Sequence, residues 1–244
     1  MSTATSERVG LAVRWRLLSL GFTSPTTETV AEVETLAEGL LETESSPELE
    51  GVLSAMRACT VMELAAQYNE LFGGTVQVAP YEGSYELDPI CQGRQMADVA
   101  AFYRAFGAEP SGPAAERPDH VGCELEFLSF LELRCMAAAE SDDDVELLDE
   151  ISASFLSDHA GRWLPTFFAD VRNAASRAPV YRALASLGER TVGDELTRRA
   201  LEPASLPRRP SRSSVESDSF ECGGSDAAPR RVRRPVPHRD GRRG

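Results

Sequence analysis

Apolar residues recur at every third or fourth position along most of residues 9–201, which is the spacing of one face of an α-helix. No stretch alternates apolar and polar residues with the period of two that a half-buried strand requires. The chain is therefore predicted to be all-α. At 244 residues it is long enough to enclose one substantial hydrophobic core or two small ones.

Residues that favour helix starts and ends divide this pattern into segments. A second helix is expected to begin near Thr26. Ser46, followed by Pro47, can cap a third, and Thr60 to Glu63 have the spacing of a capping box. Later helices are expected over 96–106, from 119 to about 140, from Asp142 to about Gly161, over 163–175 and over 180–201. The segment that starts at 119 is apolar nearly all round, which places it at the centre of a bundle.

Two long loops and a polar tail interrupt the helical pattern. The segments 73–93 and 107–118 are rich in Gly and Pro and are predicted to be loops, which at this length are usually functional or mobile. Residues 203–244 consist mainly of Pro, Ser, Arg and Gly and cannot bury enough surface to offset the entropy of ordering. We expect one helical domain at 1–202 and a disordered tail at 203–244.

Charge is distributed unevenly between these two parts. Residues 1–202 hold 15 Arg against 34 Asp and Glu, a net charge of −19, whereas the tail has a net charge of +5. The acidic domain disfavours nucleic acid as the main partner and favours a cationic one. Arg230 to Arg234 in the tail could form an anion-binding patch or a decoy twin-arginine element, but a solvated tail is the simpler interpretation.

Cysteine usage and hydropathy favour a cytoplasmic protein. The five cysteines form no CxxC pair, and three lie within apolar helical patterns, as expected for reduced thiols. No run reaches the roughly 18 apolar residues that a membrane span needs. We expect a chain that is neither exported nor membrane-bound.

The chemically most distinctive stretch is residues 116–120, Glu-Arg-Pro-Asp-His. Pro118 disfavours helical geometry in the residue before it. Asp119 is expected to cap the following helix by accepting hydrogen bonds from its free N–H groups. His120 and Glu124 are then one turn apart on one side of that helix. Three ionisable groups meet at the entrance of an otherwise apolar helix, and such an entrance can hold a ligand.

Catalysis and metal binding are weaker interpretations of the same residues. Asp119, His120, Glu124 and Glu126 could supply an acid, a base or ligands, but they match no standard metal-ligand spacing. The chain has no Lys and no Gly-rich phosphate loop, which excludes Schiff-base chemistry and a P-loop. We expect no catalytic residue, no metal and no cofactor. The simplest alternatives are a helix cap for Asp119 and a hydrogen-bonded boundary histidine for His120.

Four short pieces of the chain resemble the TorD/DmsD/NarJ family of molybdoenzyme assembly chaperones, the nitrate reductase delta-subunit-like proteins. Residues 116–120 match the hallmark Glu, then Pro and any residue in either order, then Asp and His or Tyr. Residues 68–72 match an aromatic, two free positions and Leu-Phe. Residues 80–82 and 102–107 are also similar, and the order and separation of all four agree. The resemblance covers roughly residues 60–135.

The resemblance implies a single bundle of about eight to eleven helices that acts as a cytoplasmic chaperone and not as an enzyme. Such proteins hold the apo catalytic subunit of a molybdopterin-containing oxidoreductase, often by its twin-arginine signal peptide, until the cofactor is inserted. The implied client-binding residues are Glu116, Pro118, Asp119, His120, Glu124, Tyr68, Leu71, Phe72, Tyr81 and Glu82. A monomer or a domain-swapped dimer is implied, with the loops 73–93 and 107–118 as candidate hinges.

A twin-arginine peptide suits an acidic surface because the planar guanidinium group can make two hydrogen bonds to one carboxylate. Glu116, Asp119 and Glu124 are the expected carboxylates. Asp119→Ala and His120→Ala are each expected to weaken client binding with little change in melting temperature.

The apolar part of the peptide is expected to lie in a groove between helices near Tyr81, Tyr85 and Phe72. Tyr68, Leu71 and Phe72 fall on one helical face and are expected to be framework first and groove wall second. Two alternatives remain open: a structural subunit that stays in the mature oxidoreductase, and a metal-dependent hydrolase.

Overall fold

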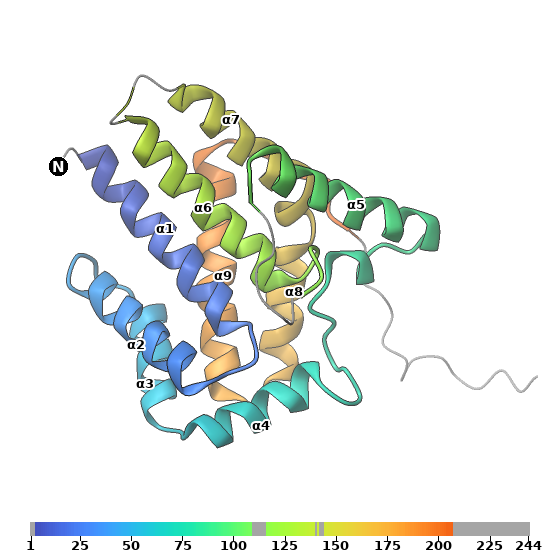
Figure 1. Ribbon diagram of the computed structural model, residues 1–244. Coiled ribbons are helices and arrows are strands. Elements are labelled where there is room, and N and C mark those ends of the chain that lie inside the picture. Colours follow the sequence, from blue (N-terminus) through green and yellow to red (C-terminus); the bar gives the residue numbers. More distant parts are fainter. Residues whose placement is uncertain (1–2, 109–115, 140, 142–143, 207–244) are drawn as a thin grey trace, which may run out of the picture. The chain divides into compact units, whose positions relative to one another are not determined.

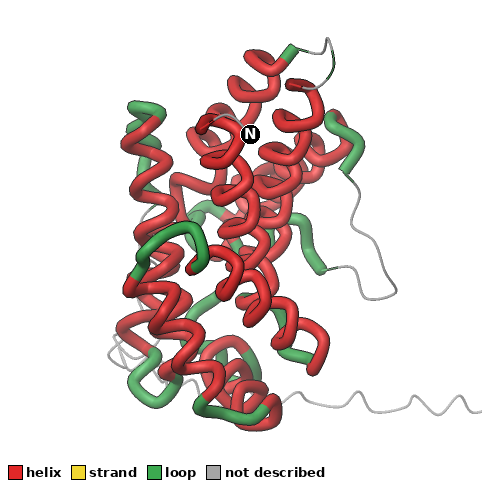
Figure 2. Tube along the Cα trace, turned by 90° about the vertical axis from the view of Figure 1, so that its left-hand side faces the viewer, coloured by secondary structure: helices red, strands yellow, loops and turns green. Residues whose placement is uncertain are grey.

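The structure is a computed structural model that describes residues 3–108, 116–139, 141 and 144–206. These residues contain nine α-helices and no strand (Figure 1, Figure 2). A 3-10 turn at Glu82–Ser84 and a π-helical turn at Leu156–Ala160 complete the set. The α-helices are α1 (Thr3–Gly21), α2 (Thr27–Leu41), α3 (Pro47–Arg57), α4 (Val61–Phe72), α5 (Pro89–Ala105), α6 (Val121–Ala139), α7 (Val145–Phe155), α8 (Gly161–Ala174) and α9 (Pro179–Arg198). The predicted all-α bundle is confirmed.

Capping side chains begin several helices where the sequence places them. Ser46 accepts a hydrogen bond from the Leu49 N–H at the start of α3. Thr60 and Glu63 form the predicted capping box at the start of α4. Asp144 caps α7. These starts are predictable because each cap involves residues within one turn of one another.

The loop after α4 is shorter than predicted. The chain is already helical at Pro89, whereas the sequence pattern begins near Met96. Asp88 caps this helix by accepting a hydrogen bond from the Ile90 N–H at 2.8 Å, and Pro89 occupies the first helical position. The non-helical segment therefore covers residues 73–88 apart from its 3-10 turn.

α6 packs antiparallel against α1 (Figure 1). Two buried hydroxyl groups fix the register: Ser19 Oγ donates to Gly122 O, and Ser129 Oγ donates to Ala12 O, both at 2.8 Å. α9 packs against α8, α3 and α1. Most of α6 is buried, as its composition predicts. Trp15, Trp163 and Phe127 are buried in the core, and Phe130 packs against it.

α7 and α8 are joined without a break by the π-helical turn, where the sequence predicts an end near His159. A Cβ atom on Gly161 would lie 2.4 Å from the Leu156 carbonyl oxygen, so only glycine fits there without a shift of the backbone. The wider turn carries His159 inward, where it is 5% exposed. Such turns are frequent at functional sites.

The packed domain extends slightly beyond the predicted boundary at residue 202. The Leu206 N–H donates to Arg162 O at 2.9 Å, and the Leu206 side chain is 5% exposed. Leu206 thus packs against the helical domain. The predictions for the rest of the tail, including the run Arg230 to Arg234, concern residues that lie outside the described part of the chain.

Candidate functional site

The loop before α5 is held against the start of α6 by backbone hydrogen bonds. The Glu82 N–H donates to Asp119 O and the Val121 N–H donates to Pro80 O, both at 2.9 Å. Between them, Tyr81 and His120 form an isolated antiparallel bridge. Residues 80–82 and 116–120, which carry two pieces of the sequence resemblance, are therefore in direct contact.

Asp119 is fully buried and does not cap α6. Its Oδ2 accepts a hydrogen bond from the Gly83 N–H at 3.2 Å. Arg117 binds the same carboxylate with both arms of its fork, Nε to Oδ1 at 3.0 Å and Nη2 to Oδ2 at 2.8 Å. The predicted capping role is wrong, because the carboxylate turns toward the loop and away from the free N–H groups of α6.

His120 takes part in capping instead. Its Nδ1 accepts a hydrogen bond from the Gly122 N–H at 3.1 Å, which leaves the ring hydrogen on Nε2. The ring is 2% exposed and stands edge-on to the Tyr81 ring, with centroids 5.3 Å apart. Burial lowers the pKa of His120, although the Glu116 and Asp119 charges oppose this. The imidazole is therefore neutral, and its Nε2 has no hydrogen-bond partner among the described residues.

Glu82 joins three elements from a wholly buried position. One carboxylate oxygen accepts a hydrogen bond from Gln95 Nε2 on α5 at 2.6 Å. The other lies 3.3 Å from His159 Nδ1 in the π-helical turn. Glu82 thus ties the loop to α5 and to the α7–α8 junction.

Glu124 is also fully buried, one turn into α6. Its Oε2 accepts a hydrogen bond from Trp163 Nε1 on α8 at 2.9 Å, and its Oε1 has no partner among the described residues. Burial, and next the nearby Glu82 charge, raise the pKa of Glu124 well above its usual range. The surroundings of this side chain therefore favour its protonated, uncharged form.

These positions correct the expected cleft. Of the three carboxylates proposed to meet a cationic peptide, only Glu116 is exposed, because Asp119 and Glu124 point into the interior. Within the described part of the chain, the expected apolar groove is not found at its predicted place either, since Tyr85 is 4% exposed and Phe72 is 8% exposed. Tyr85 packs on Trp163, and Phe72 packs among core aromatic rings.

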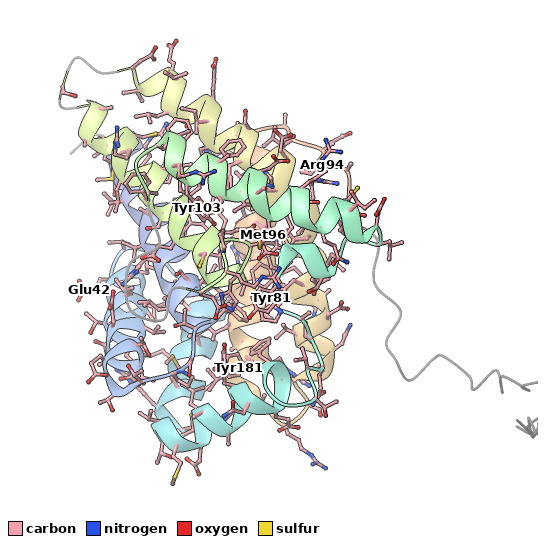
Figure 3. All side chains as sticks on the ribbon, turned by 45° about the vertical axis from the view of Figure 1, so that its right-hand side comes forward. Glu42, Tyr81, Arg94, Met96, Tyr103 and Tyr181 are labelled. Atoms are coloured by element: carbon pink, nitrogen blue, oxygen red, sulfur yellow. The ribbon has the colours of Figure 1, made fainter. Side chains whose placement is uncertain are left out.

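Four side chains remain at the surface where the two hallmark motifs meet: Tyr68, Tyr81, Glu116 and Arg117, here called the motif surface. Tyr81 Oη donates to Glu116 Oε1 at 3.3 Å, and Arg117 Cζ lies 4.5 Å from the centre of the Tyr81 ring. Burial and then the Glu116 charge raise the pKa of both tyrosines, so the Glu116 charge acts on Tyr68 as well as on Tyr81. Tyr81 comes from the loop between α4 and α5 (Figure 3).

Three further residues of the two hallmark motifs are less exposed: Leu71, Phe72 and Pro118. Leu71 is 1% exposed and Phe72 lies within the core, which agrees with a framework role. Pro118 is half-buried, and its carbonyl oxygen accepts a hydrogen bond from Tyr103 Oη on α5 at 2.8 Å (Figure 3). The start of α6 is therefore held by the loop before α5 and by α5 itself.

Four further residues take part in this site: Gln95, Tyr103, His159 and Trp163. Sequence patterns gave no signal for Gln95 or Trp163, and Tyr103 was noted only within the similar segment 102–107. Each reaches the motif from another helix or from the π-helical turn, 13 or more residues away along the chain. For His159 the sequence offered one indication of a role, because the chain has only three histidines.

Neither a metal site nor a membrane span is found in the described residues. No group of three or more His, Cys, Asp or Glu side chains there could hold a metal ion. No helix in this part of the chain combines the length and the apolar character needed to cross a bilayer.

Comparison with known proteins places the chain in a family. The family described as nitrate reductase delta subunit matches residues 28–169, more than half of the chain. The chain belongs to this family. The matched region contains both hallmark motifs and all the residues of the motif surface, so the family assignment includes the site.

Three proteins with similar sequences are named as chaperones. The chain is 36% identical to a selenate reductase assembly chaperone protein of Thauera selenatis over 45% of this chain and 58% of the relative. It is 35% identical to a chlorate reductase assembly chaperone protein of Ideonella dechloratans over 43% of this chain and 55% of the relative. It is 26% identical to the chaperone protein TorD of Vibrio cholerae over 64% of this chain and 76% of the relative.

The chain thus spans less than two thirds of the first two relatives.

A crystal structure of a redox enzyme maturation protein from Archaeoglobus fulgidus has the same fold, with a TM-score of 0.54 and 21% identity. The match covers 75% of this chain and 93% of that one. At this identity the likeness supports the helical fold alone. None of these relatives is named as a catalyst.

Proposed function

We propose that this protein is a cytoplasmic assembly chaperone. It binds the apo catalytic subunit of a molybdopterin-containing oxidoreductase and supports cofactor insertion before export or assembly. The family match and the names of the relatives support this role. The buried state of Asp119, His120 and Glu124 argues against a hydrolase, because substrate could not reach them without opening the fold.

One observation carries the proposed mode of binding: two hallmark motifs, far apart in the sequence, converge on the motif surface. Glu116 presents an exposed carboxylate beside two tyrosines, Tyr68 and Tyr81. A client arginine can make two charge-assisted hydrogen bonds to such a carboxylate and can stack on an aromatic face. The twin-arginine signal peptide of the client is the segment that suits this surface.

In this proposal the remaining client-binding residues do not touch the client in the free fold but support the motif surface. Asp119, His120 and Glu82 set the position of the loop on α6, and Glu124 ties α6 to α8. Pro118, Leu71 and Phe72 form the framework. The Nε2 hydrogen of His120 is a donor without a partner among the described residues, and a peptide carbonyl group is the acceptor proposed for it.

A stable subunit of the oxidoreductase is the second candidate, because the family is described as a subunit. Purification of the mature enzyme and of its apo precursor distinguishes the two. A chaperone is expected to co-purify with the apo catalytic subunit and to be absent from the active enzyme. Stoichiometric presence in the active enzyme would establish a subunit instead.

A further inference from the structure

Arg117 occupies a site that is shaped for a guanidinium group. Its fork makes two hydrogen bonds to the Asp119 carboxylate, at 3.0 and 2.8 Å, and its Cζ lies 4.5 Å from the centre of the Tyr81 ring. A bidentate carboxylate together with an aromatic face is a combination that suits arginine and not lysine. We call Asp119, Tyr81 and the backbone N–H of Gly83 the cradle.

The carboxylate of the cradle is buried, whereas the side chain of Arg117 that binds it is about half exposed. Asp119 is 0% exposed, and its Oδ2 is fixed by the Gly83 N–H. A Cβ atom on Gly83 would lie only 3.0 Å from that oxygen, so the close approach depends on glycine. The Arg117 side chain, by contrast, is 49% exposed. It can therefore leave the cradle without opening the core.

The surroundings of the cradle also suit a second arginine. Glu116 lies beside Tyr81 and is exposed. Its Oε1 accepts hydrogen bonds from the Tyr81 hydroxyl group at 3.3 Å and from the Arg117 backbone N–H at 3.0 Å. Arg117 makes no ion pair with Glu116 among those found in the described residues. The resident guanidinium group therefore pairs with only one of the two neighbouring carboxylates, that of Asp119.

We propose that the cradle is a guanidinium-binding site in which Arg117 is a resident occupant that an arginine of the client replaces. The client part of this inference rests on the proposed function. Exchange of one guanidinium group for another keeps the buried Asp119 carboxylate paired throughout. Arg117 competes with the client arginine for the cradle. A site that is already occupied in the free protein binds its ligand with reduced apparent affinity, which favours release of the client.

Chemical rescue tests the cradle without any client. Arg117→Ala leaves the Asp119 carboxylate unpaired, so the variant is expected to melt at a lower temperature than the wild type. Millimolar N-ethylguanidinium is expected to raise that melting temperature, whereas N-ethylammonium is not. The matched control is Arg172→Ala, which removes a similarly exposed arginine paired with the exposed Glu189. Neither this control nor the wild type is expected to respond.

Peptide titration tests the exchange. Arg117→Ala is expected to bind a twin-arginine peptide about three- to fivefold more tightly than the wild type, which is the worth of one half-exposed ion pair. A peptide with both arginines replaced by lysine is expected to lose this gain. If Arg117→Ala fails to fold, Arg117→Gln serves in both experiments.

Each outcome decides one part of the proposal. Absence of rescue by N-ethylguanidinium would overturn the cradle, whatever the client does. Rescue combined with weaker peptide binding would overturn the exchange, since Arg117 would then contact the client itself. Rescue without peptide binding to either protein would leave the cradle standing and would instead contradict the proposed function.

Discussion

At the scale of single residues, Glu124 is counted as an anion from the sequence but is buried without an ionic partner in the structure. Its pKa is raised well above the usual range, so the folded protein binds a proton that the unfolded chain releases above pH ~4.3. Stability from this group is complete below that pH and is lost as the pH rises toward the folded-state pKa.

Glu124→Gln mimics the protonated acid and removes this loss. The free energy of unfolding of the variant, relative to the wild type, is expected to rise by about 1.4 kcal/mol per pH unit above pH ~4.3 until the folded-state pKa is reached. Urea unfolding at a series of pH values measures this difference. Glu150→Gln, at an exposed position on α7, is the control. A difference independent of pH would show that Glu124 is ionised in the fold.

Asp119 requires a revision of the expectation drawn from the sequence. Asp119→Ala was expected to change client binding but not the melting temperature, yet the buried carboxylate holds both Arg117 and the Gly83 N–H. Leaving a buried donor unsatisfied costs about 1–3 kcal/mol, so the melting temperature is expected to fall by several degrees. Asp194→Ala, which removes a 74% exposed carboxylate, is the control. Equal melting temperatures for the two variants would contradict the contacts of Asp119.

At the scale of helices, the contact between α8 and α9 depends on a glycine. A Cβ atom on Gly188 would lie 2.5 Å from the Phe168 ring, which is buried in the core. Gly193, five residues further along α9, has open space around it. The same substitution at the two positions should therefore have opposite effects on stability.

Gly188→Ala is expected to lower the free energy of unfolding by about 1–3 kcal/mol, because the ring must move. Gly193→Ala is expected to raise it by about 0.5–1 kcal/mol, since alanine favours the helix. Denaturant unfolding of both variants measures the two signs. If both substitutions stabilise the protein, the two helices are not in the tight contact described.

Helix starts were predictable from the sequence, whereas the π-helical turn and the early start of α5 were not. Ser46, Thr60 and Asp144 cap their helices through neighbours three residues away, so the signal is local. The π-helical turn depends on the fit of Gly161 against a carbonyl group, which no hydrophobic period reports.

The same distinction holds for the site. The two hallmark motifs were found from the sequence, and their meeting on one surface agrees with a common role. The inward direction of Asp119 and Glu124 was not predictable, because their partners Gly83 and Trp163 lie 36 and 39 residues away. A local pattern places an acidic residue on a helix, but tertiary contacts decide whether it faces solvent.

At the scale of the whole molecule, the acidic balance of residues 1–202 suits a cationic client. The contact between the chain and that client is proposed to occur at the motif surface, with Glu116 as the exposed carboxylate. Isothermal titration calorimetry with the N-terminal twin-arginine peptide of the client measures this contact directly.

The wild type is expected to bind the peptide with a dissociation constant of about 1 μM, which corresponds to about −8 kcal/mol. Glu116→Gln is expected to bind about fivefold more weakly, because one exposed ion pair contributes up to about 1 kcal/mol, whereas Glu150→Gln is expected to bind as the wild type does. Failure of the wild type to bind either the peptide or the whole apo catalytic subunit would contradict the chaperone role. Unchanged affinity in Glu116→Gln would contradict the motif surface as the site.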